Sequence, residues 1–162
     1  MKKKLSHIDD NGRAHMVDIG GKKDSRRRAV AGGRVLISKD LLKQLRANSL
    51  AKGDALTVAR IAAIQAAKKT SDLIPLCHTL PLTHVVVNLT LIDDPPSVEI
   101  EVETQTRYKT GVEMEALTAA AVATLTIYDM GKAVDKGMII ESIKLLKKEG
   151  GQSGNWNREG NE

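Results

Sequence analysis

Hydrophobic and polar residues alternate most regularly between residues 98 and 103. Val98, Ile100 and Val102 are separated by glutamates, so one face of this segment is apolar and the other is charged. Alternation with a period of two is typical of a β-strand with one exposed face. Residues 85–92 predict a preceding strand, and the turn formers at 93–96 join the two strands as an antiparallel hairpin.

The pattern becomes helical in two segments of the first half. Ser38 is a good N-cap for a helix that continues to Ala47, in which the leucines at 41, 42 and 45 share one face. Asp54 caps a second helix that we expect to end near Lys69. Alanines surround most of this second helix, which predicts that it is buried on more than one side.

A third helix is expected over residues 112–128, which are almost continuously apolar. Thr110 and Glu113 have the spacing of a capping box, in which Glu113 would bond back to the backbone of Thr110. Residues 28–37 and 138–146 supply the first and last strands. The resulting order βαββαβ is that of a ferredoxin-like α+β sandwich with an antiparallel sheet, here with one extra helix.

The chain is expected to form a single domain, residues 1–162. Its first 28 residues and its tail from about residue 150 to 162 are polar and rich in turn formers, so we expect a mobile arm and a mobile tail. Helices that are apolar nearly all round would leave apolar patches exposed on a monomer. The pattern therefore favours an oligomer.

Composition narrows the class of protein. The one cysteine cannot form an internal disulfide, residues 1–4 lead into polar residues without the apolar stretch of a secretory signal, and no segment is long enough to span a bilayer. We expect a cytoplasmic protein that does not act at a membrane.

Charge is distributed unevenly along the chain. Residues 1–60 hold 15 Lys and Arg against 6 Asp and Glu, within a total net charge of +5. An excess of positive charge favours an anionic partner. Nucleic acid is disfavoured, because single-strand binding usually adds aromatic stacking platforms and this chain has only three aromatic residues. A small phosphorylated ligand fits better.

The first candidate for chemistry is the segment Leu76, Cys77 and His78, which follows Pro75 at the end of an apolar stretch. Proline restricts the backbone, so these side chains are expected on a rigid loop. Cys77 is either an inert buried thiol or part of a site, and His78 is either a satisfied loop histidine or a proton-transfer group. The spacing of cysteine and histidine does not suit a metal site.

Two charged clusters flank the third helix. Either Glu113 or Glu115 is free for chemistry if the other caps the helix. Asp129 and Lys132 are three residues apart, so they form either a surface ion pair or an acid and base pair in which burial lowers the lysine pKa. Lys52 precedes a helix start, where it is either solvated or receives a phosphate.

Several motifs together resemble the molybdenum cofactor biosynthesis protein C family, the cyclic pyranopterin monophosphate synthases. They are HMVD at 15–18, KGD at 52–54, ARIAAIQAAK at 59–68, LIPLCH at 73–78, KTGVEMEALT at 109–118 and IYDM at 127–130. The resemblance extends from about His7 to Gly154. Collinear motifs of this length are highly specific.

The resemblance implies a phosphorus-oxygen lyase that converts (8S)-3′,8-cyclo-7,8-dihydroguanosine 5′-triphosphate into cyclic pyranopterin monophosphate and pyrophosphate. It implies a homohexamer, a trimer of dimers, with active sites at dimer interfaces. An upstream radical enzyme of the same pathway is expected to supply the substrate. No cofactor is required by the sequence. Mg²⁺ could assist with the phosphates, but no carboxylate cluster demands it.

Site residues follow from the same resemblance. Asp129 matches the family's catalytic acid or base, and Lys132 and Lys52 match lysines tied to substrate binding and proton transfer. The ligand-contacting positions are matched by Leu76, Cys77, His78, Glu113, Met114 and Glu115. Lys68, Lys69 and an arginine of the 26–28 run have the charge needed to neutralise the departing pyrophosphate.

Two residues differ from the family's usual pattern. Thr79 follows His78 where proline is usual, which would loosen the loop, and Gly131 would let the third helix end before Lys132. Two other classes of function stay open: a phosphometabolite- or nucleic-acid-binding module without catalysis, and an RNA binder that uses Arg26 to Arg28. The second predicts a salt-dependent affinity for RNA.

Overall fold

The computed structural model describes residue 8, residues 11–152 and residues 154–158. The elements in chain order are β1 (Ser25–Leu36), α1 (Lys39–Arg46), α2 (Ala55–Lys68), α3 (Thr70–Leu73), β2 (Leu82–Asp93), β3 (Pro96–Tyr108), α4 (Glu113–Gly131), β4 (Ile139–Glu149) and β5 (Trp156–Asn157). The strands form one antiparallel sheet in the order β2-β3-β1-β4-β5. The described chain is therefore an α+β structure with an open five-stranded sheet and four helices.

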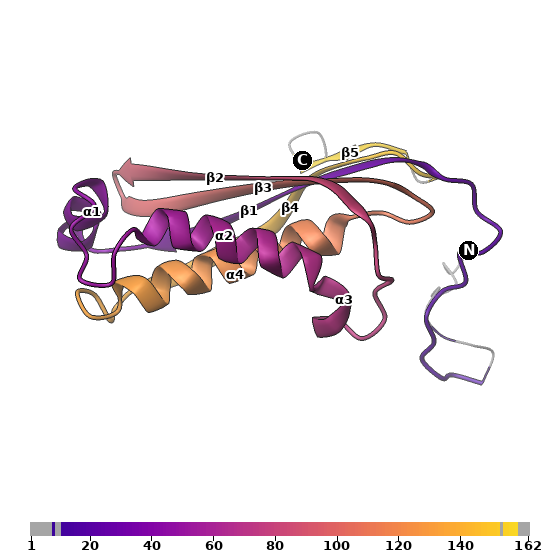
Figure 1. The fold of residues 1–162 in the computed structure, drawn as a ribbon, viewed down its shortest axis with the longest axis horizontal. Coiled ribbons are helices and arrows are strands. Elements are labelled where there is room, and N and C mark those ends of the chain that lie inside the picture. The colour runs from indigo at the N-terminus through magenta and orange to yellow at the C-terminus, as the bar shows by residue number, and fades with distance from the viewer. Residues whose placement is uncertain (1–7, 9–10, 153, 159–162) are drawn as a thin grey trace.

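The two long helices α2 and α4 lie side by side against one face of the sheet (Figure 1). Their facing positions are small: Ala59 and Ala63 on α2 and Ala120 and Ala123 on α4 are fully buried. Side chains of this size let the two helix backbones approach closely, which suits a core with few aromatic residues. The alanine-rich second helix predicted from the sequence is confirmed.

The sheet buries the alternating apolar positions and exposes the charged ones. Val98, Ile100 and Val102 of β3 are buried under the helices, as the alternation predicts. On β1, a Cβ added to Gly33 would lie 2.9 Å from Cγ2 of Thr124. This glycine therefore lets α4 approach β1 more closely than any side chain would allow.

The N-caps predicted for the first two helices are confirmed. The Ser38 hydroxyl accepts a hydrogen bond from the Leu41 amide at 3.2 Å, and Asp54 Oδ1 accepts one from the Thr57 amide at 3.0 Å. These bonds satisfy amides that have no partner within the helix. The β2–β3 hairpin is also confirmed.

Other boundaries differ from the sequence prediction. The strand β1 begins at Ser25, inside the predicted arm, and the elements α3 and β5 were not predicted. Trp156 pairs with Lys148 across β5 and β4, a contact that local sequence does not reveal. Residues 1–7, 9, 10, 153 and 159–162 lie outside the described residues, and the mobility of the arm and tail stays a prediction.

The helix α4 continues three residues beyond the predicted end at Tyr128. It ends at Gly131, with Lys132 as its C-cap. A Cβ at Gly131 would lie 2.7 Å from Cδ2 of the buried Leu41, so glycine here allows α1 and α4 to pack closely. The helix thus ends immediately before Lys132, as expected from Gly131, although later than the predicted end at Tyr128.

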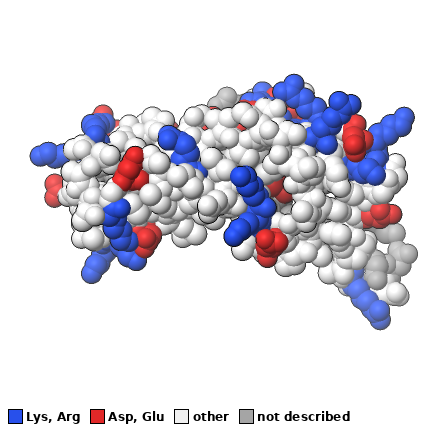
Figure 2. Space-filling view, in the orientation of Figure 1, with Lys and Arg blue, Asp and Glu red and all other residues white. Residues whose placement is uncertain are grey.

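Charged side chains are distributed unevenly over the surface. Lys and Arg gather densely over the end of the sheet where β1 begins and β4 ends, at the upper right of Figure 2. None of the helices within the described ranges is both long and apolar enough to cross a bilayer.

Candidate functional site

The C-terminal end of α4 carries a group of one carboxylate and two ammonium groups. Lys52 Nζ lies 2.9 Å from Asp129 Oδ2, and Lys132 Nζ lies 2.7 Å from Asp129 Oδ1. Lys52 also donates a hydrogen bond to the backbone carbonyl of Asp129 at 2.7 Å. We call these three residues the lysine–aspartate cluster; they are the three that the sequence predicted to be catalytic.

Local backbone structure brings Lys52 to this position. The loop before α2 turns at Gly53, whose φ of +92° is a conformation that favours glycine, and Asp54 then caps the helix. Lys132 follows the last residue of α4 and lies one turn beyond Asp129. A loop and a helix end that are far apart in sequence thus meet at one carboxylate.

The electrostatics of the cluster decide between the two interpretations of Asp129 and Lys132. Hydrogen bonds from Lys132 and then from Lys52 lower the pKa of Asp129 to about 2. The hydrogen bond with Asp129 raises the pKa of Lys132, whose side chain is 52% exposed. The alternative in which burial lowers the lysine pKa was wrong, and the cluster keeps a net positive charge at neutral pH.

The other end of α4 borders a cavity of about 290 Å³, which we call the histidine pocket. Its lining comes from the segment before β1, the loop after α3 and the start of α4. The lining residues are Val17, Ile19, Lys22, Leu76, Cys77, His78, Leu80, Thr110, Gly111, Glu113, Met114 and Glu115. All six ligand-contacting residues predicted at 76–78 and 113–115 are thus in one cavity.

The ring of His78 is held by the segment that precedes β1. Its Nε2 lies 2.8 Å from the carbonyl oxygen of Val17. A carbonyl oxygen can only accept, so Nε2 is the hydrogen-bond donor in this contact. Thr79 donates to the Ser71 hydroxyl at 3.1 Å, a bond that ties the loop to α3 in the absence of the usual proline.

Glu113 does not close the predicted capping box. Val112 is the residue before the helix, and no side chain caps it. The Glu113 carboxylate instead lies 3.3 Å from Lys148 Nζ on β4. A Cβ at Gly111 would lie 1.9 Å from Glu113 Oε2, so a side chain at position 111 would displace this carboxylate. Glu113 is therefore a pocket residue and its capping role was wrong.

Glu115 lies deeper, at 4% exposure. Burial is the main cause that raises its pKa to about 7; a hydrogen bond with its own backbone opposes the shift, and the charge of Glu113 adds to it. Burial and then Glu115 also raise the pKa of the Cys77 thiol. The pocket thus contains two carboxyl groups with different surroundings.

The two groups are far apart within one chain. An α-helix rises about 1.5 Å per residue, so about 21 Å of α4 separate Glu115 from Asp129. Lys68 and Lys69, which were predicted to contact substrate, are exposed at the C-terminal end of α2 and do not line the histidine pocket. The predicted site residues of one chain therefore lie in two separate groups, one at each end of α4, which we call half-sites.

Sequence reasoning missed several pocket residues. Lys148 is brought to Glu113 by β4, and Val17, Ile19 and Lys22 reach the pocket from the predicted arm. In the arm, the half-buried Val17 and Ile19 alternate with exposed residues, a short signal that could have marked a packed segment. Nothing in the local sequence indicates that Lys148 would contact Glu113.

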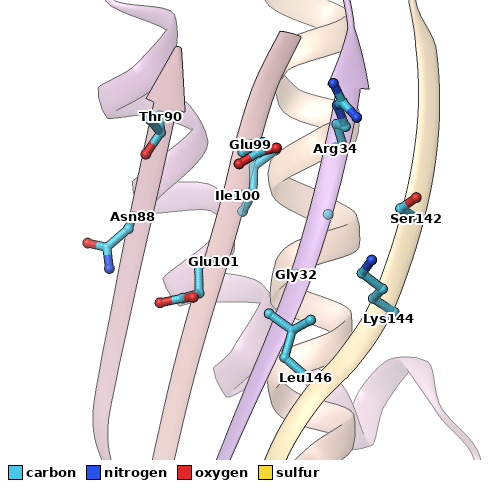
Figure 3. A pocket seen from close by; sticks show the side chains of 11 residues that line it. Gly32, Arg34, Asn88, Thr90, Glu99, Ile100, Glu101, Ser142, Lys144 and Leu146 are labelled. Carbon is cyan, nitrogen blue, oxygen red and sulfur yellow. The ribbon is translucent and has the colours of Figure 1, made fainter. Parts of the chain in front are cut away.

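A larger hollow of about 550 Å³ lies on the opposite, open face of the sheet (Figure 3). Gly32 leaves its floor without a side chain, between Glu101 of β3 and Lys144 of β4. It contains none of the residues predicted for catalysis or binding. Within the described residues, no group of three His, Cys, Asp or Glu side chains is placed to hold a metal ion.

Comparisons with known proteins agree with the motifs. Residues 16–151 match the model of the MoaC family. A cyclic pyranopterin monophosphate synthase of Heliobacterium modesticaldum is 56% identical over 155 residues, which cover 96% of this chain and 98% of that protein. The synthase of Thermomicrobium roseum is 53% identical over 98% of this chain and 95% of its own length. The synthase of Corynebacterium glutamicum is 54% identical over 94% of this chain and 97% of its own length.

Proposed function

The chain belongs to the MoaC family, and from this premise we infer that it is a cyclic pyranopterin monophosphate synthase, a lyase of molybdenum cofactor biosynthesis. Its substrate would be (8S)-3′,8-cyclo-7,8-dihydroguanosine 5′-triphosphate, and its products cyclic pyranopterin monophosphate and pyrophosphate. The main structural support for this function is the lysine–aspartate cluster. In it, Lys52 and Lys132 both lie within hydrogen-bond distance of the Asp129 carboxylate.

The cluster suits the phosphate half of the reaction. A sugar hydroxyl must attack the α-phosphorus while the bond to pyrophosphate breaks and its electron pair leaves with the pyrophosphate. The ammonium groups of Lys52 and Lys132 can neutralise the charge of the triphosphate. A pKa of about 2 keeps Asp129 ionised at neutral pH, so it can orient both lysines as a fixed negative charge, and it is not a proton donor.

The histidine pocket suits the ring half of the reaction. Opening the reduced imidazole ring and closing a pyrazine ring need groups that give and take protons near neutral pH. Glu115, whose pKa is raised to about 7, is such a group, and the imidazole of His78 lines the same cavity. Mg²⁺ carried by the triphosphate could add to charge neutralisation at the cluster.

We propose that the complete site forms between two chains. The two half-sites lie at opposite ends of α4, so a two-fold axis across the middle of the helix layer would place each cluster beside the partner's pocket. Exposed apolar side chains lie on this layer and would be buried there: Val58 and Ile61 on α2 and Leu125 on α4 are 42%, 52% and 58% exposed. Such a contact supports the dimer of the expected hexamer.

Other expectations belong to the same proposal. The strand order β2-β3-β1-β4 with helices in both crossovers supports a ferredoxin-like topology, extended by β5.

We place the protein in the cytoplasm, where an upstream radical enzyme would supply the cyclo-nucleotide. Lys68 and Lys69 would reach the triphosphate only as part of the assembled site.

The assignment is tested by incubating the purified chain with the cyclo-nucleotide and measuring cyclic pyranopterin monophosphate and pyrophosphate. We expect the wild-type chain to form both products, and Asp129→Ala and Lys132→Ala to lose at least about 100-fold in kcat. Lys136→Ala, which changes an exposed lysine on the same loop, is the matched control and should keep its activity. A wild-type chain that binds the nucleotide without turnover would instead indicate a binding module.

A further inference from the structure

Glu115 is the one acidic residue that is buried among the described residues. It lies in the first turn of α4 and lines the histidine pocket. No ion pair within 4.0 Å reaches its carboxyl group from the described part of the chain, whereas Glu113 has Lys148 at 3.3 Å. The pocket therefore holds one carboxylate that is paired with a cation and one carboxyl that is buried without one.

The groups around Glu115 come from four parts of the chain. Glu113 is on the same helix turn, and Lys148 on β4 forms an ion pair with it. Cys77 and His78 are on the loop after α3, and Lys22 is on the segment before β1. Lys22 is exposed and His78 is bound to the Val17 carbonyl. The charge that acts on Glu115 is that of the Glu113 carboxylate, which disfavours a second negative charge beside it.

Burial and this neighbour together raise the pKa of Glu115 to about 7. The amides at the start of α4 favour a negative charge, and the hydrogen bond with its own backbone lowers the pKa, but burial is the larger effect. A buried carboxyl group with a raised pKa, beside a carboxylate that is paired with a lysine, suits a proton donor next to a fixed charge.

Building on the proposed function, we propose that Glu115 holds a proton in the histidine pocket and gives it to the ring nitrogen that is released when the substrate's reduced imidazole ring opens. The carbon between the two ring nitrogens is an aminal. One C–N bond breaks and its electron pair goes to the leaving nitrogen, which takes the proton from Glu115 Oε. The other nitrogen forms a C=N bond with its lone pair and releases its own N–H proton, which restores the Glu115 carboxyl group.

The geometry distinguishes this role from that of Asp129. Asp129 is exposed and held ionised by two lysines at the other end of α4, so it acts as a fixed negative charge, whereas Glu115 is enclosed and protonated until about pH 7. Each half-site would then have its own carboxyl group, which orients the lysines in the cluster and donates a proton in the pocket.

The protonation state is tested on the chain without substrate by infrared difference spectroscopy. The carboxylic acid band present in the wild type and absent in Glu115→Gln should titrate with a midpoint about 7. In Glu113→Gln the midpoint should fall, because one negative neighbour is removed. A midpoint near the ordinary glutamate value of 4.5 would overturn the proposal.

The proton transfer is tested by kinetics. Wild-type kcat should fall as the pH rises through about 7, because the donor loses its proton. Glu115→Gln, which keeps the shape but has no acidic proton, should bind the nucleotide within about threefold of the wild type yet lose about 100-fold or more in kcat. Glu115→Asp should recover part of this loss.

The outcomes separate the two hypotheses. Undiminished kcat in Glu115→Gln would end the role of Glu115 as proton donor and leave the proposed function intact. A wild-type chain with the expected titration but without product would contradict the proposed function, and with it the ring-opening step, while the buried protonated carboxyl would stand as a structural property.

Discussion

Asp129 and Glu115 are carboxyl groups on one helix, and their surroundings drive their pKa values in opposite directions. Two ammonium groups surround the exposed Asp129 and lower its pKa to about 2, while burial raises that of Glu115 to about 7. The same functional group is thus a fixed negative charge at one end of α4 and a proton donor at the other. The separation depends on which groups the fold brings near each carboxyl.

The buried Glu115 also affects stability. Its folded pKa exceeds the unfolded value of 4.5, so the folded state binds the proton more tightly, and stability falls as the pH rises from about 4.5 to about 7. Glu115→Gln has no carboxyl group to ionise, so it removes this loss of stability. Since one pKa unit corresponds to about 1.4 kcal/mol, the variant should raise the free energy of unfolding above pH 7 by up to about 3 kcal/mol. Urea unfolding at several pH values measures it; equal gains at acid and alkaline pH would contradict the explanation.

At the scale of elements, three positions resembled helix caps and only two of them act as caps. Ser38 and Asp54 each accept a hydrogen bond from a helix amide, whereas Thr110 lies too early in the chain because α4 begins at Glu113. The carboxylate of Glu113 is directed to Lys148 instead. A capping pattern in sequence therefore forms only where the backbone and the competing partners permit it.

This difference gives a paired prediction. Asp54→Ala removes the bonds to the Thr57 amide and hydroxyl, so it should lower the free energy of unfolding by about 1 kcal/mol. Thr110→Ala removes no cap and should change it by less than about 0.5 kcal/mol. Chemical denaturation of both variants checks this; an equal loss in the two would restore the capping box at Thr110.

At the scale of the whole molecule, a single chain contains both half-sites but keeps them about 21 Å apart along α4. The exposed apolar side chains on the helix layer and the position of the two half-sites both favour assembly through this face. Activity would then require a partner, since each site would use the cluster of one chain and the pocket of the other.

Mixing inactive variants tests this arrangement. When Asp129→Ala and His78→Ala chains are unfolded together and refolded, half of the dimers are mixed and each has one intact site, so activity should return to about a quarter of the wild type. A mixture of Asp129→Ala with Lys132→Ala is the control and should stay inactive, because both changes damage the cluster. No recovery in the first mixture would mean that each site belongs to one chain.

The sequence by itself determined the α+β class, the main strands and helices, the caps at Ser38 and Asp54, the three residues of the cluster and six of the residues that line the pocket. The elements and caps depend on periodicity and on local hydrogen bonding, which can be read from neighbouring positions, whereas the site residues followed from the resemblance. Its motifs also pointed to the family that the comparisons show.

Only the tertiary structure decided how these residues work. It paired Glu113 with Lys148, bound His78 to Val17, placed Lys52 against Asp129 and buried Glu115. It also divided the predicted site between the two ends of α4. The physical reason is that desolvation and ion pairing depend on sheet register and helix packing, which join residues that are far apart in the chain.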